Sequence, residues 1–352
     1  MDIKSIYELL HKNPELGNQE YVTANIIESF LNSLHIPYVK MLETGIVGFI
    51  DKGKSKTIIL RAEMDAIKIN GKVIHACGHD MHVAMLLGVA EKLLCADIEC
   101  NVKLVFQPDE EGYGGAERMI DKGVLDSVSS CFAMHVWPEF EFGEVGLKVG
   151  ELTSTCDFFE IEVLGKGGHV AKPDYYVNPI SIAFDIAKRL EKIKLNEPFL
   201  LDITSINADE QEGTANAVPN ICKLRGSMRV VNAEKRYELS EKIENNCRNY
   251  NCKYTPTFLT QYPPMINDER LINLVQKAIS KYVKIIKIDK PYFIAEDFAC
   301  FSEKIPSTLI LLGCTPKEKL GNNELHTQDL IIDERTLQLG IDLWEKIVRD
   351  YK

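Results

Sequence analysis

The strongest constraint on the fold is a set of short, continuous apolar runs with a helical pattern between two of them. Three such runs occupy residues 46–50, 57–60 and 102–106 and are bounded by polar or Gly-rich segments. Runs of this length without alternation are typical of strands buried on both faces of a sheet. Residues 82–94, which lie between the last two runs, repeat apolar side chains at helical spacing. The sequence therefore predicts an α/β domain whose mixed sheet is covered by helices.

A different pattern begins near residue 155. Apolar and acidic side chains alternate over residues 159–163, as in a strand with one solvent-facing side. A helical stretch, two strand-like runs and another helical stretch follow, at residues 179–195, 199–206, 222–230 and 233–248. This order predicts a smaller α+β module inserted into the larger domain. We place the inserted module at residues 155–266 and the larger domain at residues 1–154 and 267–352.

Length and charge narrow the class of protein. A chain of 352 residues fits two domains, and its net charge of −11 without a basic stripe argues against a nucleic-acid surface. The apolar runs are too short to span a bilayer, and charged residues near Met1 disfavour a signal peptide. We therefore interpret the ten scattered cysteines as reduced thiols. These features predict a cytoplasmic protein.

One nucleotide-binding motif is rejected. Residues 48–55 match the P-loop pattern G-x-x-x-x-G-K-[ST], which requires a helix directly after it. Residues 56–60 are instead rich in β-branched side chains. We therefore interpret residues 51–56 as a hairpin turn.

A histidine-rich segment carries the first chemical signal. Three of the eight histidines lie within residues 75–82, where Cys77 and His79 flank Gly78. A thiolate and an imidazole at this spacing can bind one zinc-like cation if the glycine permits a tight bend. A buried cysteine beside a hydrogen-bonded histidine would explain the same residues.

Further residues of types that bind metals come after other apolar runs or lie elsewhere in the chain. Glu110 and Glu111 come after the run at 102–106, where ligand sites of α/β sheets usually form. His135 ends another run, and His326 lies far down the chain. Each of these alone is more often a structural or solvated residue. Five donors from several loops suit an open catalytic site for two divalent ions better than a closed structural zinc site, and the candidates are Cys77, His79, Glu111, His135 and His326.

Together these motifs resemble the M20 family of metallopeptidases, in particular its aminoacylase/amidohydrolase branch. That branch includes N-acyl amino acid deacetylases, hippurate hydrolases and N-acetyl-diaminopimelate deacetylases. The resemblance runs through residues 11–16, 61–66, 75–82, 106–112, 134–138, 165–169, 216–220, 296–298 and 325–326. It implies a zinc-peptidase-like catalytic domain with an inserted α+β lid, through which a homodimer could form.

The resemblance also implies roles for individual residues. The five donors above look like ligands for two divalent ions, which would be zinc, manganese, nickel or cobalt. Glu110 resembles the general base that takes a proton from metal-activated water, and Asp65 resembles the aspartate that orients a metal-binding histidine. His169 resembles an oxyanion-stabilising residue. Arg229 and Asn216 resemble lid residues that hold the substrate carboxylate.

The implied reaction is metal-dependent hydrolysis of the amide bond of an N-acyl amino acid, with N-acetyl-diaminopimelate among the candidate substrates. A carboxypeptidase or dipeptidase of the same family, or a short peptide substrate, is the alternative, followed by a non-catalytic metal-binding protein. Glu63 and Lys68 depart from the branch's usual Asp and Pro, and the segment 66–74 is shorter than usual. These departures affect the expectation for the substrate and leave the proposed ligands and base in place.

Overall fold

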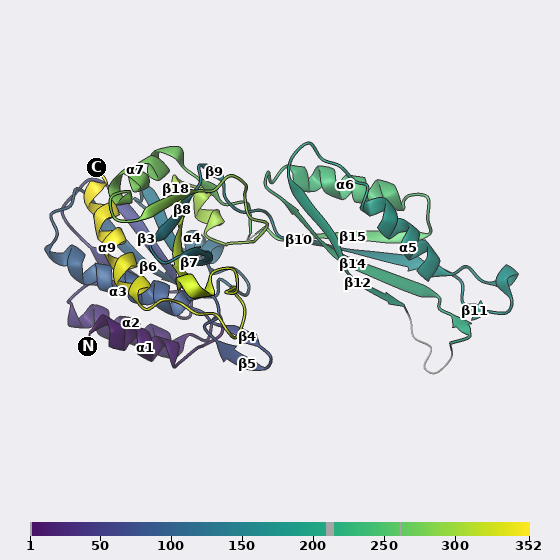
Figure 1. Ribbon diagram of the computed structural model, residues 1–352, viewed down its shortest axis with the longest axis horizontal. Helices are drawn as coiled ribbons and strands as arrows, with labels where there is room; N and C mark the ends of the chain where they lie inside the picture. The colour runs from purple at the N-terminus through teal and green to yellow at the C-terminus, as the bar shows by residue number, and fades with distance from the viewer. Residues whose placement is uncertain (1, 209–214, 261) are drawn as a thin grey trace. The chain divides into compact units, whose positions relative to one another are not determined.

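The computed structural model describes residues 2–208, 215–260 and 262–352, which form two compact units (Figure 1). The first unit comprises residues 1–152, 265–290 and 296–352, and the second comprises residues 153–264 and 291–295. The predicted larger domain includes residues 291–295. They belong to the second unit, and the carbonyl of Ile294 accepts a hydrogen bond from the Ser154 N–H of that unit at 3.1 Å.

The first unit is built on a mixed sheet with the strand order β1-β2-β6-β3-β7-β18-β8-β17. Its central strands β6, β3, β7 and β18 run parallel, and β3, β7 and β18 are buried along most or all of their length. This agrees with the predicted mixed α/β sheet. The strands are β1 (Tyr38–Met41), β2 (Gly45–Ile50), β3 (Thr57–Glu63), β6 (Asn101–Gln107), β7 (Ser130–Glu141), β8 (Glu144–Leu147), β17 (Lys284–Lys287) and β18 (Ser307–Thr315). Short pairs are formed by β4 (Ile67–Ile69) with β5 (Lys72–Ile74), and by β9 (Gly150–Glu151) with β16 (Ile266–Asn267).

The helix α3 (His79–Cys95) lies at the centre of the helical layer. It packs on β3 and β7 and contacts both α1 (Ile3–His11) and α9 (Arg335–Asp350). Every residue of α3 from His79 to Ala90 is buried, as expected for a helix that is apolar around most of its surface. The N-terminus of α3 is therefore held firmly inside the unit. The remaining helices are α2 (Tyr21–Ser33), α4 (Gly115–Asp121), α7 (Glu269–Ile279) and α8 (Ala299–Ser302).

The predicted hairpin at residues 51–56 is wrong. Strands β2 and β3 do not pair with each other, because β6 lies between them, antiparallel to β2 and parallel to β3. Asn101, the first residue of β6, accepts hydrogen bonds from the backbone N–H groups of Lys52 (2.9 Å) and Lys54 (3.2 Å). The Asn101 side chain thus satisfies two backbone N–H groups of the connection between β2 and β3. No helix follows Ser55, so the rejection of a P-loop stands.

The second unit is a four-stranded antiparallel sheet with the order β12-β14-β10-β15 and two helices on one face. Its elements are β10 (Asp157–Leu164), α5 (Pro179–Leu190), β12 (Phe199–Ala208), β14 (Ile221–Val230), α6 (Lys235–Cys247) and β15 (Cys252–Phe258), with β11 (Gly168–His169) paired to β13 (Ala217–Val218). This βαββαβ order is that of ferredoxin-like modules. Alternate residues of β14, such as Leu224 and Met228, are buried beneath the helices, and Arg225 on the opposite face is exposed.

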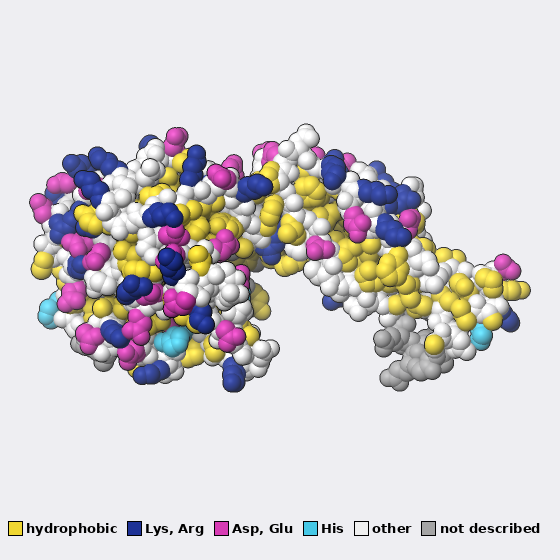
Figure 2. Space-filling model, viewed as in Figure 1, with side chains coloured by type: hydrophobic (Ala, Val, Ile, Leu, Met, Phe, Trp, Pro, Cys, Tyr) yellow, Lys and Arg dark blue, Asp and Glu magenta, His cyan; other side chains and the backbone are white. Residues whose placement is uncertain are grey.

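Charged side chains of both signs are interspersed on the visible face of the first unit (Figure 2). This mixture fits the net charge of −11 and differs from the single-sign surface of a nucleic-acid-binding protein. Among the helices in the described ranges, none combines the length and the hydropathy needed to cross a membrane.

Candidate metal centre

The candidate site is assembled where parallel strands of the first unit end. Glu63 is the last residue of β3, and Glu110 and Glu111 follow the end of β6. The bend after β6 is made by Asp109, whose φ is 58°. The Asp109 N–H donates to the Glu20 carboxylate at 2.9 Å, which anchors the bend. Carboxyl ends of parallel strands commonly carry the ligands of α/β proteins.

Gly78 makes the tight bend between two of the predicted ligands. Its φ of 82° lies in the left-handed region that favours glycine. A Cβ at this position would lie 2.4 Å from Cγ2 of Val136, which excludes a side chain on steric grounds as well. Cys77 and His79 are therefore brought to one side of the loop at the start of α3.

The structure brings the five predicted ligands together. Cys77 Sγ lies 3.5 Å from His135 Nε2, and Cys77, Glu111 and His326 offer atoms within 4.8 Å of one another. His326 Nε2 lies 3.0 Å from Glu111 Oε1, and His79 Nε2 lies 4.0 Å from the same oxygen. These contacts join residues that are up to 249 positions apart in sequence.

The tautomers of two histidines follow from their hydrogen bonds. His79 Nδ1 lies 2.9 Å from the backbone carbonyl of Asp65, and His135 Nδ1 lies 2.6 Å from that of Val136. A carbonyl only accepts, so each Nδ1 carries the proton. In the neutral form of each ring, Nε2 then has the lone pair that a metal-binding histidine requires.

The donor geometry fits a zinc-like cation. Zn–S and Zn–N bonds of about 2.3 and 2.0 Å in a tetrahedral arrangement place the two ligand atoms about 3.5 Å apart. This is the separation of Cys77 Sγ and His135 Nε2. The buried His79 Nε2 has no hydrogen-bond partner, and a cation between it and Glu111 would coordinate this nitrogen. The residues present therefore suit a thiolate-, imidazole- and carboxylate-bound metal.

The charges of the cluster also favour a cation. Burial, together with Glu111 and Glu110, raises the pKa of the Cys77 thiol well above its ordinary value. Burial alone would lower the pKa of His79, but Asp65 and Glu63 raise it to about 10. Carboxylates contribute to both shifts, and these negative surroundings hold protons where a divalent cation could replace them.

Glu110 differs from the predicted ligand Glu111 in its surroundings. Burial and the neighbouring carboxylates Glu296 and Glu111 raise the pKa of Glu110 well above the ordinary glutamate value. It lies in one group with His79 and Glu111, whose ligand atoms are within 4.8 Å of one another. A buried carboxyl that readily holds a proton next to a cation site is suited to proton transfer.

Asp65 connects the loops that carry these residues. Its carbonyl and its Oδ1 lie 2.9 and 3.3 Å from His79 Nδ1, and its Oδ2 accepts the Glu111 N–H at 2.9 Å. This is the placement required of a residue that orients a metal-binding histidine.

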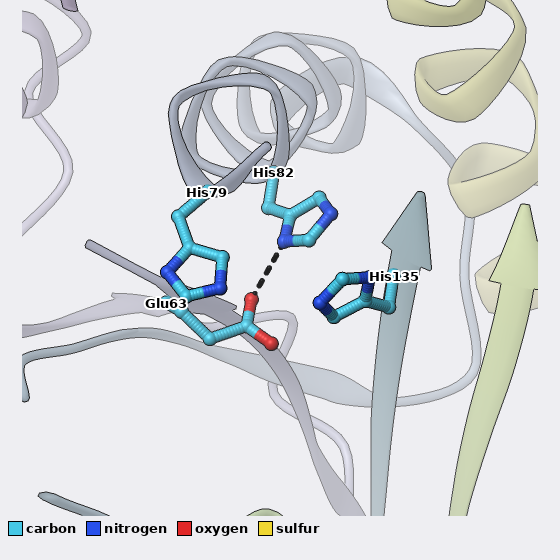
Figure 3. A group of neighbouring side chains, drawn as sticks. All are labelled: Glu63, His79, His82 and His135. Carbon is cyan, nitrogen blue, oxygen red and sulfur yellow. Dashed lines mark hydrogen bonds and ion pairs between the residues drawn. The ribbon is translucent and has the colours of Figure 1, made fainter. Parts of the chain in front are cut away.

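Sequence reasoning missed Glu63 and His82, which complete a second group with His79 and His135 (Figure 3). His82 Nδ1 lies 2.8 Å from Glu63 Oε2, and His82 Nε2 accepts the Val136 N–H at 2.9 Å. Burial lowers the pKa of His82 to about 4, against the opposite effect of Glu63. The signal was present: His82 follows His79 by three residues, which places both on one face of a helix.

A buried network of ion pairs surrounds the Glu63 carboxylate. Arg61 forms ion pairs with Glu63, Glu296 and Asp297. Burial alone would raise the pKa of Glu63, but Arg61 and His82 hold it well below its ordinary value. Asp297 also accepts from Gln107 Nε2 (2.7 Å) and from the Ala116 N–H (2.9 Å). The network thus joins β3, β6, α4 and the segment before α8.

The other predicted residues lie in the second unit. His169 is part of β11 and Asn216 directly precedes β13, with Asn216 Nδ2 3.4 Å from His169 Nε2. Arg229 lies on β14, where its Cα is paired with that of Leu200. The structure therefore brings His169 and Asn216 together, and Arg229 occupies a different part of the unit.

The fold and this cluster define a metal-binding α/β enzyme. The sequence pattern of peptidase family M20/M25/M40 matches residues 59–350, and the chain belongs to this family of hydrolases.

Curated relatives cover nearly the whole chain and differ in substrate. IAA-amino acid hydrolase ILR1-like 4 of Arabidopsis thaliana is 30% identical over 97% of this chain and 84% of its own length. Thermostable carboxypeptidase 2 of Saccharolobus solfataricus is 32% identical, with 96% and 92% covered. N-acetylcysteine deacetylase of Bacillus subtilis is 31% identical, with 94% and 92% covered.

A solved structure agrees with the fold. The Bacillus subtilis YXEP protein, described as a dinuclear metal binding peptidase of the M20 family, superposes with a TM-score of 0.82. It is 26% identical to this chain, and the match covers 98% of this chain and 96% of that one. The predicted family and α/β class are therefore confirmed.

Proposed function

We propose that this hydrolase cleaves the amide bond of N-acyl amino acids, using two divalent ions and Glu110 as general base. The observation that carries the proposal is the convergence of Cys77, His79, Glu111 and His326 with a buried Glu110 that holds a proton readily. The deacetylase of Bacillus subtilis and the IAA-amino acid hydrolase support an N-acyl amino acid as substrate. N-acetyl-diaminopimelate is one candidate within this class.

The ligands proposed for the two ions are Cys77, His79, Glu111, His135 and His326. Bound divalent ions polarise a substrate carbonyl and lower the pKa of water, which supplies a nucleophile near neutral pH. Zinc, manganese, nickel and cobalt are the candidate metals, and the thiolate of Cys77 favours zinc, nickel or cobalt over magnesium.

Glu110 accepts the proton of the attacking water and returns it to the leaving amine. Asp65 keeps His79 in the Nδ1–H tautomer, so that its Nε2 faces the cluster. For His169, Asn216 and Arg229 we propose contacts with the oxyanion and the substrate carboxylate, supported by their match to family motifs and, for the first two, by their mutual contact. The guanidinium of Arg229 suits bidentate binding of a carboxylate.

We further propose a cytoplasmic homodimer that pairs through the second unit. The ten free cysteines support a reducing compartment. The mostly solvent-accessible edge strand β12 supports pairing between copies.

The test is hydrolysis of a panel of N-acetyl amino acids, N-acetyl-diaminopimelate, hippurate and dipeptides, with each metal added in turn. We expect metal-dependent release of amine that Glu110→Gln lowers at least about a hundredfold, while Glu91→Gln, an exposed residue of α3, leaves it unchanged. Equal turnover by wild type and Glu110→Gln would contradict the mechanism.

The panel also tests the second candidate function. Thermostable carboxypeptidase 2 favours a peptidase of the same family. Cleavage of dipeptides without cleavage of N-acetyl amino acids would select that alternative. Stoichiometric metal binding without turnover on any of these compounds would leave a substrate outside the panel or a non-catalytic metal-binding protein.

A further inference from the structure

His82 connects a buried ion pair to the backbone beside His135. Arg61 is ion-paired to Glu63, Glu63 accepts from His82 Nδ1–H, and His82 Nε2 accepts the Val136 N–H. The three side chains are almost inaccessible, with 1%, 1% and 2% of their residue surfaces exposed. Because both ring nitrogens already have partners, His82 has no lone pair left for a metal ion. Its position near the cluster therefore needs another explanation.

Val136 is held at both of its backbone groups. Its N–H donates to His82, and its carbonyl accepts the Nδ1–H of His135 at 2.6 Å. The rings of His82 and His135 also meet edge to face, with centroids 4.6 Å apart (Figure 3). A shift of Val136 would therefore turn the His135 ring, whose Nε2 lies 3.5 Å from Cys77 Sγ.

Glu63 determines which nitrogen of His82 carries the proton. A carboxylate only accepts hydrogen bonds, so it selects the Nδ1–H tautomer and leaves Nε2 free to accept from Val136. In the other tautomer an Nε2–H would point at the Val136 N–H, leaving two buried donors without an acceptor. The Glu63 carboxylate is in turn ion-paired to Arg61.

We propose that His82 is a positioning residue, its tautomer fixed by Glu63, that orients His135 through Val136. The inference rests on the proposed function in one respect, namely that His135 is a metal ligand. It assigns to the Arg61, Glu63 and His82 chain the task of keeping one donor of the centre in place.

Two variants of His82 separate the hydrogen bond to Val136 from that to Glu63. The amide oxygen of Gln can reach the position of Nε2 and accept from the Val136 N–H. The shorter Asn amide reaches only the position of Nδ1, so it can bond to Glu63 and loses the bond to Val136. Binding of Co²⁺ is measured by titration of the visible absorption bands, which report ligand geometry without substrate. We expect His82→Asn to weaken Co²⁺ binding about 10- to 100-fold and alter the spectrum, and His82→Gln to stay within about threefold of wild type.

Equal Co²⁺ affinities and spectra of the two variants would overturn the inference. Thermal unfolding of the metal-free proteins checks that both fold, and His35→Asn, at an exposed histidine, is the control. Absence of hydrolysis by wild type would count against the proposed function alone, because Co²⁺ binding does not depend on it.

A measurement on the wild-type chain requires no folded variant. Long-range ¹H–¹⁵N NMR of protein labelled at histidine reports the protonation of each ring nitrogen. We expect His82 in the neutral Nδ1–H form both without metal and with zinc. An Nε2–H tautomer would overturn the inference, because that nitrogen could not accept from Val136.

Discussion

His11 Nδ1 lies 2.6 Å from Asp80 Oδ2, and this pair links the end of α1 to the first turn of α3. The Asp80 side chain is almost fully buried, whereas the His11 side chain is 58% exposed. The contact therefore ties the motif at residues 11–16 directly to the segment that carries Cys77 and His79.

This pair predicts a pH-dependent contribution to stability. The hydrogen bond to Asp80 raises the pKa of His11 above its ordinary 6.5, so the protonated form is favoured in the folded state. The stabilisation is complete below about pH 6.5 and is lost as the pH rises through the raised value. Because His11 is exposed, it amounts to less than about 1 kcal/mol.

The measurement compares thermal midpoints of metal-free wild type and His11→Asn at about pH 5.5 and about pH 9. We expect the variant to be less stable at the lower pH and the difference to shrink at the higher one. The control His35→Asn should show no such trend. A difference that grows with pH would contradict the prediction.

Gly78→Ala should abolish metal binding, whereas Gly71→Ala should not. Both glycines have a φ of 82°, so the backbone strain of about 1–2 kcal/mol is shared. Only at Gly78 would the new Cβ collide with Val136, since no atom lies within 4 Å at Gly71. Zinc affinity by equilibrium dialysis and unfolding by urea measure both effects. Equal zinc affinities of the two variants would show that the bend does not hold Cys77 and His79 in place.

Arg61→Met should destabilise the first unit by about 3–5 kcal/mol, because it leaves buried carboxylates without a counter-charge. The matched control is Arg225→Met, whose side chain is 63% exposed and pairs with Glu160. We expect that substitution to cost about 0–1 kcal/mol. The change in urea midpoint distinguishes the two, and similar midpoints would mean that the carboxylates are neutral in the folded protein.

Local sequence pattern was sufficient to predict three of the main strands. The apolar runs at 46–50, 57–60 and 102–106 correspond to β2, β3 and β6, since burial on both faces leaves a direct trace in composition. The order in which the strands pair left no such trace in the composition. The placement of β6 between β2 and β3 depends on the crossover through α3, and the edge strand β15 was not predicted.

The supporting residues of the site were harder to predict. Asp297 meets Arg61 across 236 positions, and no periodicity encodes such a contact. In the sequence, Glu63 is noticeable only as a departure from the family pattern. In the structure, it accepts the hydrogen bond that fixes the tautomer of His82. The candidate ligands could be chosen from the sequence because cysteine, histidine and glutamate are metal-ligand types wherever they lie, whereas a positioning residue is defined only by its neighbours.

The order of the sheet has a consequence for biosynthesis. Strand β18 lies between β7 and β8, although the whole second unit precedes it in the chain. During synthesis from the N-terminus, the second unit has its complete sequence before the first unit can close its sheet. His326, which meets Glu111, is synthesised later still. The nascent chain therefore lacks the last of the five proposed ligands until it is nearly complete, so a metal centre that uses all five would be completed only at the end of translation.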